Sequence, residues 1–201
     1  MRFQIRLLRF FTLMAAFLII TSKTFAAMPD ITAGETSFNI FKGCYIFRNN
    51  VRVSDRGMVM TAKQATAQMT SQKVWATGGV TFEQEGIKFK CDKILVKAAE
   101  SYAEVIGGLN LMQDDGAIKI TGDVGKFSWD DKCADFYGKV KLTVSKNAKV
   151  KIDSNLNVKP NKINGAYAHI RYNIVEKKIV ALDKEYSKIP SQEFSEPDPT
   201  E

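Results

Sequence analysis

Few side chains in this sequence are of the types that carry acid–base or metal chemistry. The 201 residues include a single histidine, His169, in a segment predicted to be a strand. No serine–histidine–aspartate or cysteine–histidine set with a supporting context accompanies it, and no glycine-rich phosphate loop is present. His169 is therefore interpreted as a structural or exposed residue. The sequence predicts no catalytic residue and no enzyme.

Two carboxylate pairs, Asp114-Asp115 and Asp130-Asp131, could in principle act on a glycosidic bond. Both lie in turn-like surroundings, where aspartate is favoured for conformational reasons. A glycosidase needs facing carboxylates in a cleft, and no such arrangement is indicated. Trp75 and Trp129 could form a sugar platform, but Trp129 falls beside predicted interior positions, which favours a core or lipid contact. A polysaccharide-cleaving β-helix is thus the weakest alternative.

Three cysteines, Cys44, Cys91 and Cys133, are the remaining reactive side chains. An odd count leaves at least one thiol unpaired, and no CxxC pair or metal-ligand cluster is present. We expect the three cysteines to fill small apolar spaces in the core, and we expect the protein to bind no metal and no cofactor.

The first 26 residues have the pattern of a secretory signal peptide. Arg2, Arg6 and Arg9 precede an apolar run at 10–20, and Thr24-Phe25-Ala26 offers small residues for cleavage after Ala26. An uncleaved anchor is the alternative, but a run of about 11 to 14 residues is short of the roughly 20 that span a bilayer. The prediction is export with cleavage after Ala26.

Removal of residues 1–26 also changes the charge. Four of the 29 Lys and Arg residues are lost and no acidic residue is, which leaves 25 against 22 Asp and Glu. No basic stripe remains, so nucleic acid is not an expected partner.

The chain contains an internal repeat. Val51, Val80 and Leu109 begin equivalent units 29 residues apart, and a fourth start follows about 31 residues later at Val140. Each unit is predicted to hold four short strands, with glycines at 78–79, 107–108 and 138 before each new start. The fold class is therefore all-β, built from repeats of about 29 to 31 residues.

The same face of each strand is apolar in every unit, because side chains on a strand alternate with period 2. One unit cannot bury its own face, so the units must stack and turn these faces inward. The residues predicted to line the shared interior are Val53, Met60, Phe82, Phe89, Leu111, Ile120, Phe127 and Phe136.

The pattern at the unit starts and corners resembles the LptA/OstA family of periplasmic proteins of lipopolysaccharide export. The likeness rests on Asn50-Val51, Gly79-Val80, Gly108-Leu109, Cys91-Asp92 and Gly122-Asp123, and it extends over residues 37–182. Asn49-Asn50 replaces the double glycine at the first corner, and residues 145–160 fit no unit.

The resemblance implies an open, twisted β-jellyroll over 27–186 whose apolar interior receives the acyl chains of lipid A. It also implies that the open ends pair with similar jellyrolls of inner- and outer-membrane components, or head-to-tail with other copies. Two other interpretations remain open: a membrane-anchored LptC-like relative, and a structural β-solenoid with a dry core. The Pro-rich acidic tail at 187–201 is predicted to be disordered.

Overall fold

The computed structural model describes residues 30–55, 57–153, 164–182 and 194. The predicted signal peptide lies outside the described residues, and so does the predicted tail apart from Phe194. The Phe194 ring centroid lies 5.4 Å from Lys93 Nζ.

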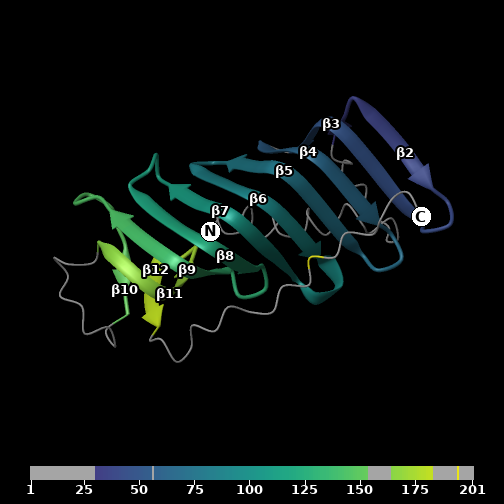
Figure 1. The fold of residues 1–201 in the computed structure, drawn as a ribbon. Helices are drawn as coiled ribbons and strands as arrows, with labels where there is room; N and C mark the ends of the chain where they lie inside the picture. Colours follow the sequence, from purple (N-terminus) through teal and green to yellow (C-terminus); the bar gives the residue numbers. More distant parts are fainter. Residues whose placement is uncertain (1–29, 56, 154–163, 183–193, 195–201) are drawn as a thin grey trace.

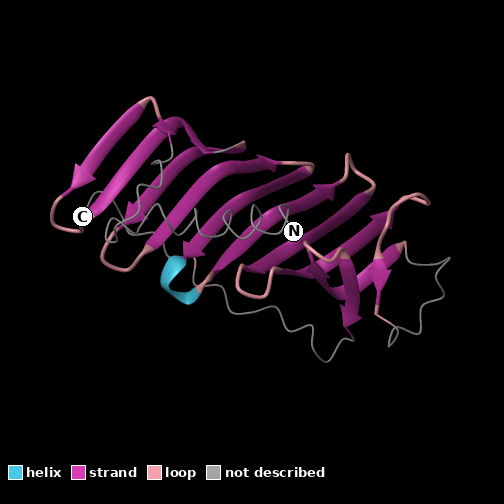
Figure 2. Ribbon diagram, turned by 180° about the vertical axis from the view of Figure 1, so that it is seen from behind, coloured by secondary structure: helices cyan, strands magenta, loops and turns pink. Residues whose placement is uncertain are grey.

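The described chain forms one 12-stranded sheet (Figures 1 and 2). Its strands are β1 (Asp30–Thr32), β2 (Glu35–Asn39), β3 (Cys44–Asp55), β4 (Met58–Gln68), β5 (Lys73–Gln84), β6 (Ile87–Lys97), β7 (Tyr102–Gln113), β8 (Ile118–Ser128), β9 (Cys133–Val144), β10 (Lys151–Ile152), β11 (Gly165–Asn173) and β12 (Lys178–Leu182). A three-residue 3-10 turn, Ala98–Glu100, joins β6 to β7.

Neighbours in the sheet are almost all neighbours in sequence. The order is β1-β3-β4-β5-β6-β7-β8-β9-β11-β12-β10, with β2 also paired to β3. Every pairing is antiparallel except β10 with β12. The predicted all-β, stacked antiparallel fold is confirmed.

The strands are longer than the sequence pattern predicts. The segments expected as separate short strands at 87–91 and 94–96 are the two halves of the single strand β6. The reason is that the chain bends at each corner without leaving the sheet. A bulge adds an unpaired residue and kinks the strand, while hydrogen bonding resumes beyond it.

These bends line up in one column across the sheet. The register shifts between Arg48 and Val51, and equivalent shifts occur at Thr61/Gln64, Thr77/Val80, Lys90/Lys93, Ile106/Leu109, Thr121/Val124 and Tyr167/His169. The column divides the sheet into two arms. We call the part with residues 51–55, 58–62, 80–84, 87–91, 109–113, 118–122 and 140–144 the first arm. The second arm holds residues 44–48, 64–68, 73–77, 93–97, 102–106, 124–128, 133–137 and 169–173.

The two arms fold over one another and enclose an interior. Phe89 of the first arm lies edge-on to Phe127 of the second, with ring centroids 5.0 Å apart. A Cβ added at Gly125, on the second arm, would lie 2.7 Å from Leu109 Cδ2 on the first. The residues of both arms belong to one buried cluster. The sheet is therefore an open jellyroll whose core lies between its own two halves.

A contact between neighbouring strands explains the glycines at the bends. The side chain of Asp92 lies over Gly107, where an added Cβ would come within 2.2 Å of Asp92 Oδ2, and Gly107 has a φ of +73°. Lys63 covers Gly78 and Asp123 covers Gly138 in the same way. The Asp92 carboxylate therefore occupies the space above the bend of the neighbouring strand.

Candidate functional site

Six of the eight residues predicted to line the interior form one continuous row on the first arm. Strand register joins them directly in the order Val53, Met60, Phe82, Phe89, Leu111, Ile120. Leu142 continues the row on β9 and was not among the predicted residues, although its alternation with Val140 was a visible signal. The other two, Phe127 and Phe136, lie opposite on the second arm, with ring centroids 6.1 Å apart.

Burial along this row is graded. Val53 and Met60, at the β3–β4 end, are half-buried. Phe82 and Phe89 are just buried, and Leu111 and Ile120 are 1% and 0% exposed. Apolar packing is thus complete at the β7–β9 end of the interior and incomplete at the β3–β4 end.

The opposing face of the second arm includes several alanines. Ala65 pairs with Ala76, and Ala67, Ala103 and Ala134 occupy further inward positions. At these alanine positions the second arm leaves room for larger side chains of the first arm, whereas Phe127 and Phe136 are bulky. This arrangement lets the arms come close, as at Leu109 and Gly125.

An aromatic series at the β2–β3 hairpin was missed from the sequence. Phe38 and Tyr45 are cross-strand partners with ring centroids 4.6 Å apart, and Tyr45 stacks on Phe47 at 6.3 Å. Phe38 and Tyr45 are 51% and 41% exposed, whereas Phe47 belongs to the buried cluster. The alternation of Tyr45 and Phe47 was the available signal, but it precedes the first repeat unit.

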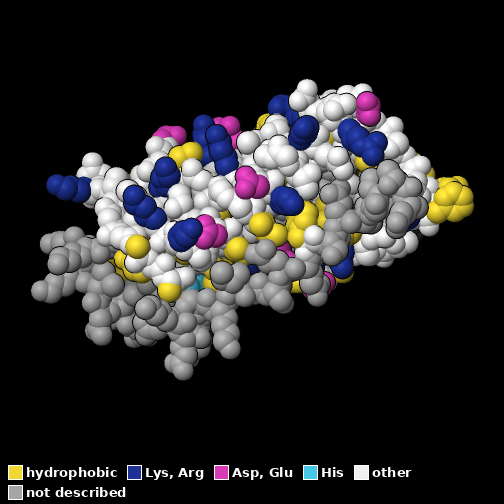
Figure 3. Space-filling model, in the orientation of Figure 1, with side chains coloured by type: hydrophobic (Ala, Val, Ile, Leu, Met, Phe, Trp, Pro, Cys, Tyr) yellow, Lys and Arg dark blue, Asp and Glu magenta, His cyan; other side chains and the backbone are white. Residues whose placement is uncertain are grey.

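Apolar side chains are also exposed in the space-filling view. Figure 3 shows them in a band along one side of the molecule, while Lys and Arg are spread over the exposed strands. A further apolar group projects at the end where Figure 1 places β2. Ile40 and Phe41 of the β2–β3 hairpin are among the most exposed large apolar residues described.

One polar bridge crosses the interior. Tyr172 Oη donates a hydrogen bond to Gln113 Oε1 at 2.6 Å, and Gln113 Nε2 donates to the Ile174 carbonyl at 3.5 Å. Both side chains are buried. Burial raises the pKa of Tyr172, as does the nearby Asp114 carboxylate, so the phenol remains a donor at neutral pH.

His169 lies on the face of the second arm that points away from the interior cluster, and its side chain is buried beside Asp135. Its Nε2 is 2.8 Å from Asp135 Oδ1, and Arg171 donates two hydrogen bonds to the same carboxylate at 2.9 Å each. Tyr137 stacks on the imidazole at 4.2 Å. Burial opposes ionisation of Asp135, but the bonds from His169 and Arg171 outweigh it and lower its pKa. His169 is thus held as a structural residue.

The aspartate pairs and the cysteines lie in turns, in the core or at its margin. Both carboxylate pairs lie in turns, and Asp114 pairs with Lys177. Cys44 and Cys91 are buried free thiols, and burial raises the pKa of Cys91 to about 12. Cys133 is only half-buried, so the expectation of an apolar filler is wrong there. No group of three potential metal ligands occurs within the described residues.

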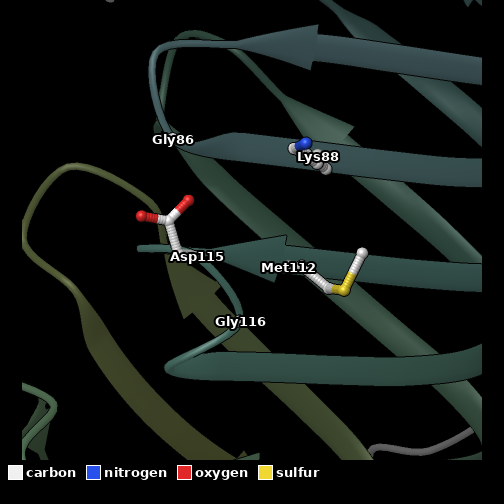
Figure 4. A pocket seen from close by; sticks show the side chains of 5 residues that line it. All are labelled: Gly86, Lys88, Met112, Asp115 and Gly116. Carbon is white, nitrogen blue, oxygen red and sulfur yellow. The ribbon is translucent and has the colours of Figure 1, made fainter.

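A small depression of about 240 Å³ lies at the turns of the first arm (Figure 4). Its lining consists of Gly86, Lys88, Met112, Asp115 and Gly116. None of the eight predicted lining residues contributes to it. The candidate site therefore remains the apolar interior between the arms.

The geometry defines a class: a folded-over antiparallel sheet with an apolar interior, similar to the LptA jellyroll. Among solved structures, the chain is similar to LptH, described as the LptA-homologous periplasmic component of the lipopolysaccharide transport device of Pseudomonas aeruginosa. The two are 12% identical with a TM-score of 0.51, and the match covers 58% of this chain and 94% of LptH. At this identity the likeness shows the fold.

The sequence comparisons add no family. No protein-family model matches the chain, and no curated protein does. Within the described ranges, no helix has the length and apolar character needed to cross a bilayer.

Proposed function

We propose that this protein binds the acyl chains of lipopolysaccharide between its two arms and carries the lipid across the periplasm. The observation that supports this is the half-buried apolar row at the β3–β4 end, where Val53 and Met60 face the interior without being fully packed. Hydrocarbon is the chemistry that such a surface takes, because it offers area and no directed polar group.

The energy of this binding is in the range that a carrier needs. Each methylene moved from water to an apolar surface contributes about 0.8 kcal/mol. A chain of about ten buried methylenes would thus gain about 8 kcal/mol before the costs of association, so micromolar affinity is an upper limit for a chain of this length. The proposed binding involves no covalent step.

The experiment uses two neighbouring positions on opposite faces of β3. A photo-crosslinking amino acid replaces Val53, which faces the interior, or Arg52, which is exposed on the outer surface. The purified protein is irradiated with lipopolysaccharide. We expect an adduct at Val53 and none at Arg52. Equal labelling, or none at either position, would reject the proposal.

Phe89→Asp is unsuitable as a loss-of-binding variant. Phe89 is buried against Phe127, so a charge there would unfold the interior and remove binding for a trivial reason. Met60→Asp, at a half-buried position in the same row, is the better loss-of-binding variant.

A structural solenoid with a dry core is the second candidate. The full burial of Leu111, Ile120 and Phe136 favours it for the β7–β9 end. A delipidated sample decides between the two. Uptake of a fluorescent fatty acid supports the carrier, and a protein that takes up none is a dry solenoid.

The partners and the location remain part of the proposal. The sheet has edges at β1–β2 and at β10, where similar jellyrolls of inner- and outer-membrane components, or further copies of this chain, could add a strand. Export with cleavage after Ala26 is a prediction that the mass of the mature protein tests. Retention of residues 1–26 would favour the membrane-anchored, LptC-like relative.

A further inference from the structure

We propose that the interior has one working mouth, at the β1–β3 end, and that acyl chains enter and leave through it because the β11–β12 end is sealed. This inference rests on the proposed function that the interior accepts acyl chains. It concerns the route of the lipid, which the fold alone does not determine.

The first part of the seal is a stretch of main chain. After β9 the chain leaves the outer margin of the first arm, where Ser145 N donates a hydrogen bond to the Ala117 carbonyl at 2.8 Å. It reaches the outer margin of the second arm at β10, where Lys151 N bonds to the Lys177 carbonyl at 2.9 Å. Residues 145–150 therefore cross the end of the interior from one arm to the other.

This crossing segment also packs on the interior. Ala148 and Val150 are partly buried against the apolar cluster. Residues 145–160 match no repeat unit, and for 145–150 the structure gives the reason: this stretch closes the stack and is not a further layer of it.

The second part of the seal is a set of side chains that tie the arms together. Gln113, at the end of β7 on the first arm, accepts the bond from Tyr172 on β11 of the second arm. Next to it, Asp114 pairs with Lys177 of the β11–β12 turn. Ile174 and Ile179 fill the space beside this bridge and are buried. A hydrocarbon chain leaving here would have to break a buried hydrogen bond, which makes this route unfavourable.

The opposite end presents apolar surface to solvent. The aromatic series Phe38, Tyr45 and Phe47 runs from half-exposed to buried and continues into the interior cluster. Val53 and Met60 of the first arm are half-buried and pack against the same interior cluster. The gradient of exposure therefore points into the interior from the β1–β3 end.

The hairpin beside this mouth is held in a fixed shape. Asn39 Oδ1 accepts hydrogen bonds from the N–H groups of Phe41 and Lys42, at 3.1 and 3.0 Å. This turn leaves Ile40 and Phe41 projecting, with Phe41 97% exposed. An arriving acyl chain thus meets apolar side chains before it reaches Phe38 and Tyr45.

A single mouth changes how such a carrier works. Donor and acceptor of the lipid must both engage the β1–β3 end, in turn, whereas a strand added at the β10 edge would join two proteins without passing lipid between them. A row of copies would not form a continuous apolar channel, because each copy is closed at β11–β12.

Crosslinking at three depths tests the route. The photo-crosslinking residue is placed at Tyr45 in the mouth, at Val53 in the interior, or at Val175 in the β11–β12 turn, with lipopolysaccharide as the probe. We expect adducts at Tyr45 and Val53 and none at Val175. An adduct at Val175 comparable to that at Tyr45 would overturn the single mouth while leaving the proposed function intact. Absence of an adduct at Val53 would reject the proposed function itself.

Exchange kinetics give a second, independent measurement. Tyr45→Glu places a charge at a half-exposed position of the mouth, so the fold tolerates it. We expect both uptake and release of a fluorescent fatty acid to slow by about tenfold with little change in affinity, since a barrier on the only route affects both directions. Glu176→Lys, at an exposed position of the β11–β12 turn, is the control and leaves both rates unchanged. Slower release in Glu176→Lys alone would show that the lipid leaves through the far end.

Discussion

At the scale of single residues, the shape of this sheet depends on which side chain covers which glycine. At each of three bends, the residue 15 positions earlier lies over the glycine: Lys63 over Gly78, Asp92 over Gly107 and Asp123 over Gly138. The repeat therefore preserves pairs of positions, and the covering residue is free to change between lysine and aspartate.

Gly107→Ala should lower the free energy of unfolding by about 3 kcal/mol. Its positive φ strains any residue with a Cβ, at about 1 kcal/mol or more, and the new methyl would also overlap Asp92. Gly79→Ala is the matched control, because its φ is +85° but nothing lies within 4 Å of an added Cβ. Urea unfolding should give a loss of only about 1 kcal/mol for the control.

A double variant separates overlap from backbone strain. The double variant Asp92→Gly, Gly107→Ala lacks the overlapping carboxylate. Its loss in free energy of unfolding should be about 1 to 2 kcal/mol smaller than the sum of the losses of the two single variants. If the two losses simply add, the contact between Asp92 and Gly107 does not shape the bend.

Asp135→Asn should destabilise the protein in a pH-dependent way. The folded pKa of this carboxyl lies below its ordinary value of 3.8, so its contribution is present above that value and is lost as the pH falls through the folded pKa. At pH 7 we expect the substitution to lower the free energy of unfolding by about 2 kcal/mol, a figure that already allows for solvent screening of the half-exposed Arg171. Below pH 3.8 the difference from the unsubstituted protein should be smaller.

Urea unfolding at several pH values measures this difference. The exposed turn residue Asp115 supplies the control, since Asp115→Asn should stay within about 0.5 kcal/mol throughout. A loss for Asp135→Asn that does not vary with pH would show that the side chain acts through its shape and not through its charge.

At the scale of elements, the arms are matched across the interior. Leu109 reaches into the space that Gly125 leaves on the opposite arm. We expect Gly125→Ala to cost about 1 to 3 kcal/mol by overpacking and Leu109→Ala about 2 to 5 kcal/mol by leaving a cavity. The double variant should lose clearly less than the sum, as measured by urea unfolding. Simple additivity would mean that the two residues do not pack together.

The sequence was sufficient to predict that these segments are strands of a stacked sheet, but not to predict how long each strand is. Alternation and spacing predicted the inward row from Val53 to Ile120, because a shift by one residue would turn every side chain outward. The same pattern could not distinguish a bend from a chain reversal at Cys91-Asp92. Both interrupt the alternation with a small residue and a polar one, and only the hydrogen bonds beyond the bend show a continuous strand.

The closed β11–β12 end of the interior also could not be predicted from local sequence patterns. Gln113 belongs to a Gln-Asp-Asp-Gly sequence that resembles any surface turn, and its partner Tyr172 lies on a distant strand. Nothing near either residue indicates that they meet. The exposure of Val53 against the burial of Ile120 was likewise hidden, because the repeat makes all the units look equivalent.

At the scale of the whole molecule, a repeat protein with one sealed end should not be equally stable along its length. Each layer is held mainly by its neighbours, so the stability of a layer depends on how well the interior beside it is packed. Packing is complete around β8, β9 and β11, and it is incomplete around β2 and β3, where Phe38 and Tyr45 meet solvent. Local opening should therefore begin at the β1–β3 end.

Hydrogen exchange measures this gradient directly. We expect amides paired between β8 and β9 to exchange only through global unfolding, and those paired between β2 and β3 to exchange faster by about tenfold or more. Because both pairs are antiparallel, strand geometry does not bias the comparison. Adding lipopolysaccharide should slow exchange in β2 and β3 and leave β11 unchanged if the lipid occupies the half-buried end. Uniform protection along the sheet would contradict the gradient of packing on which the single mouth depends.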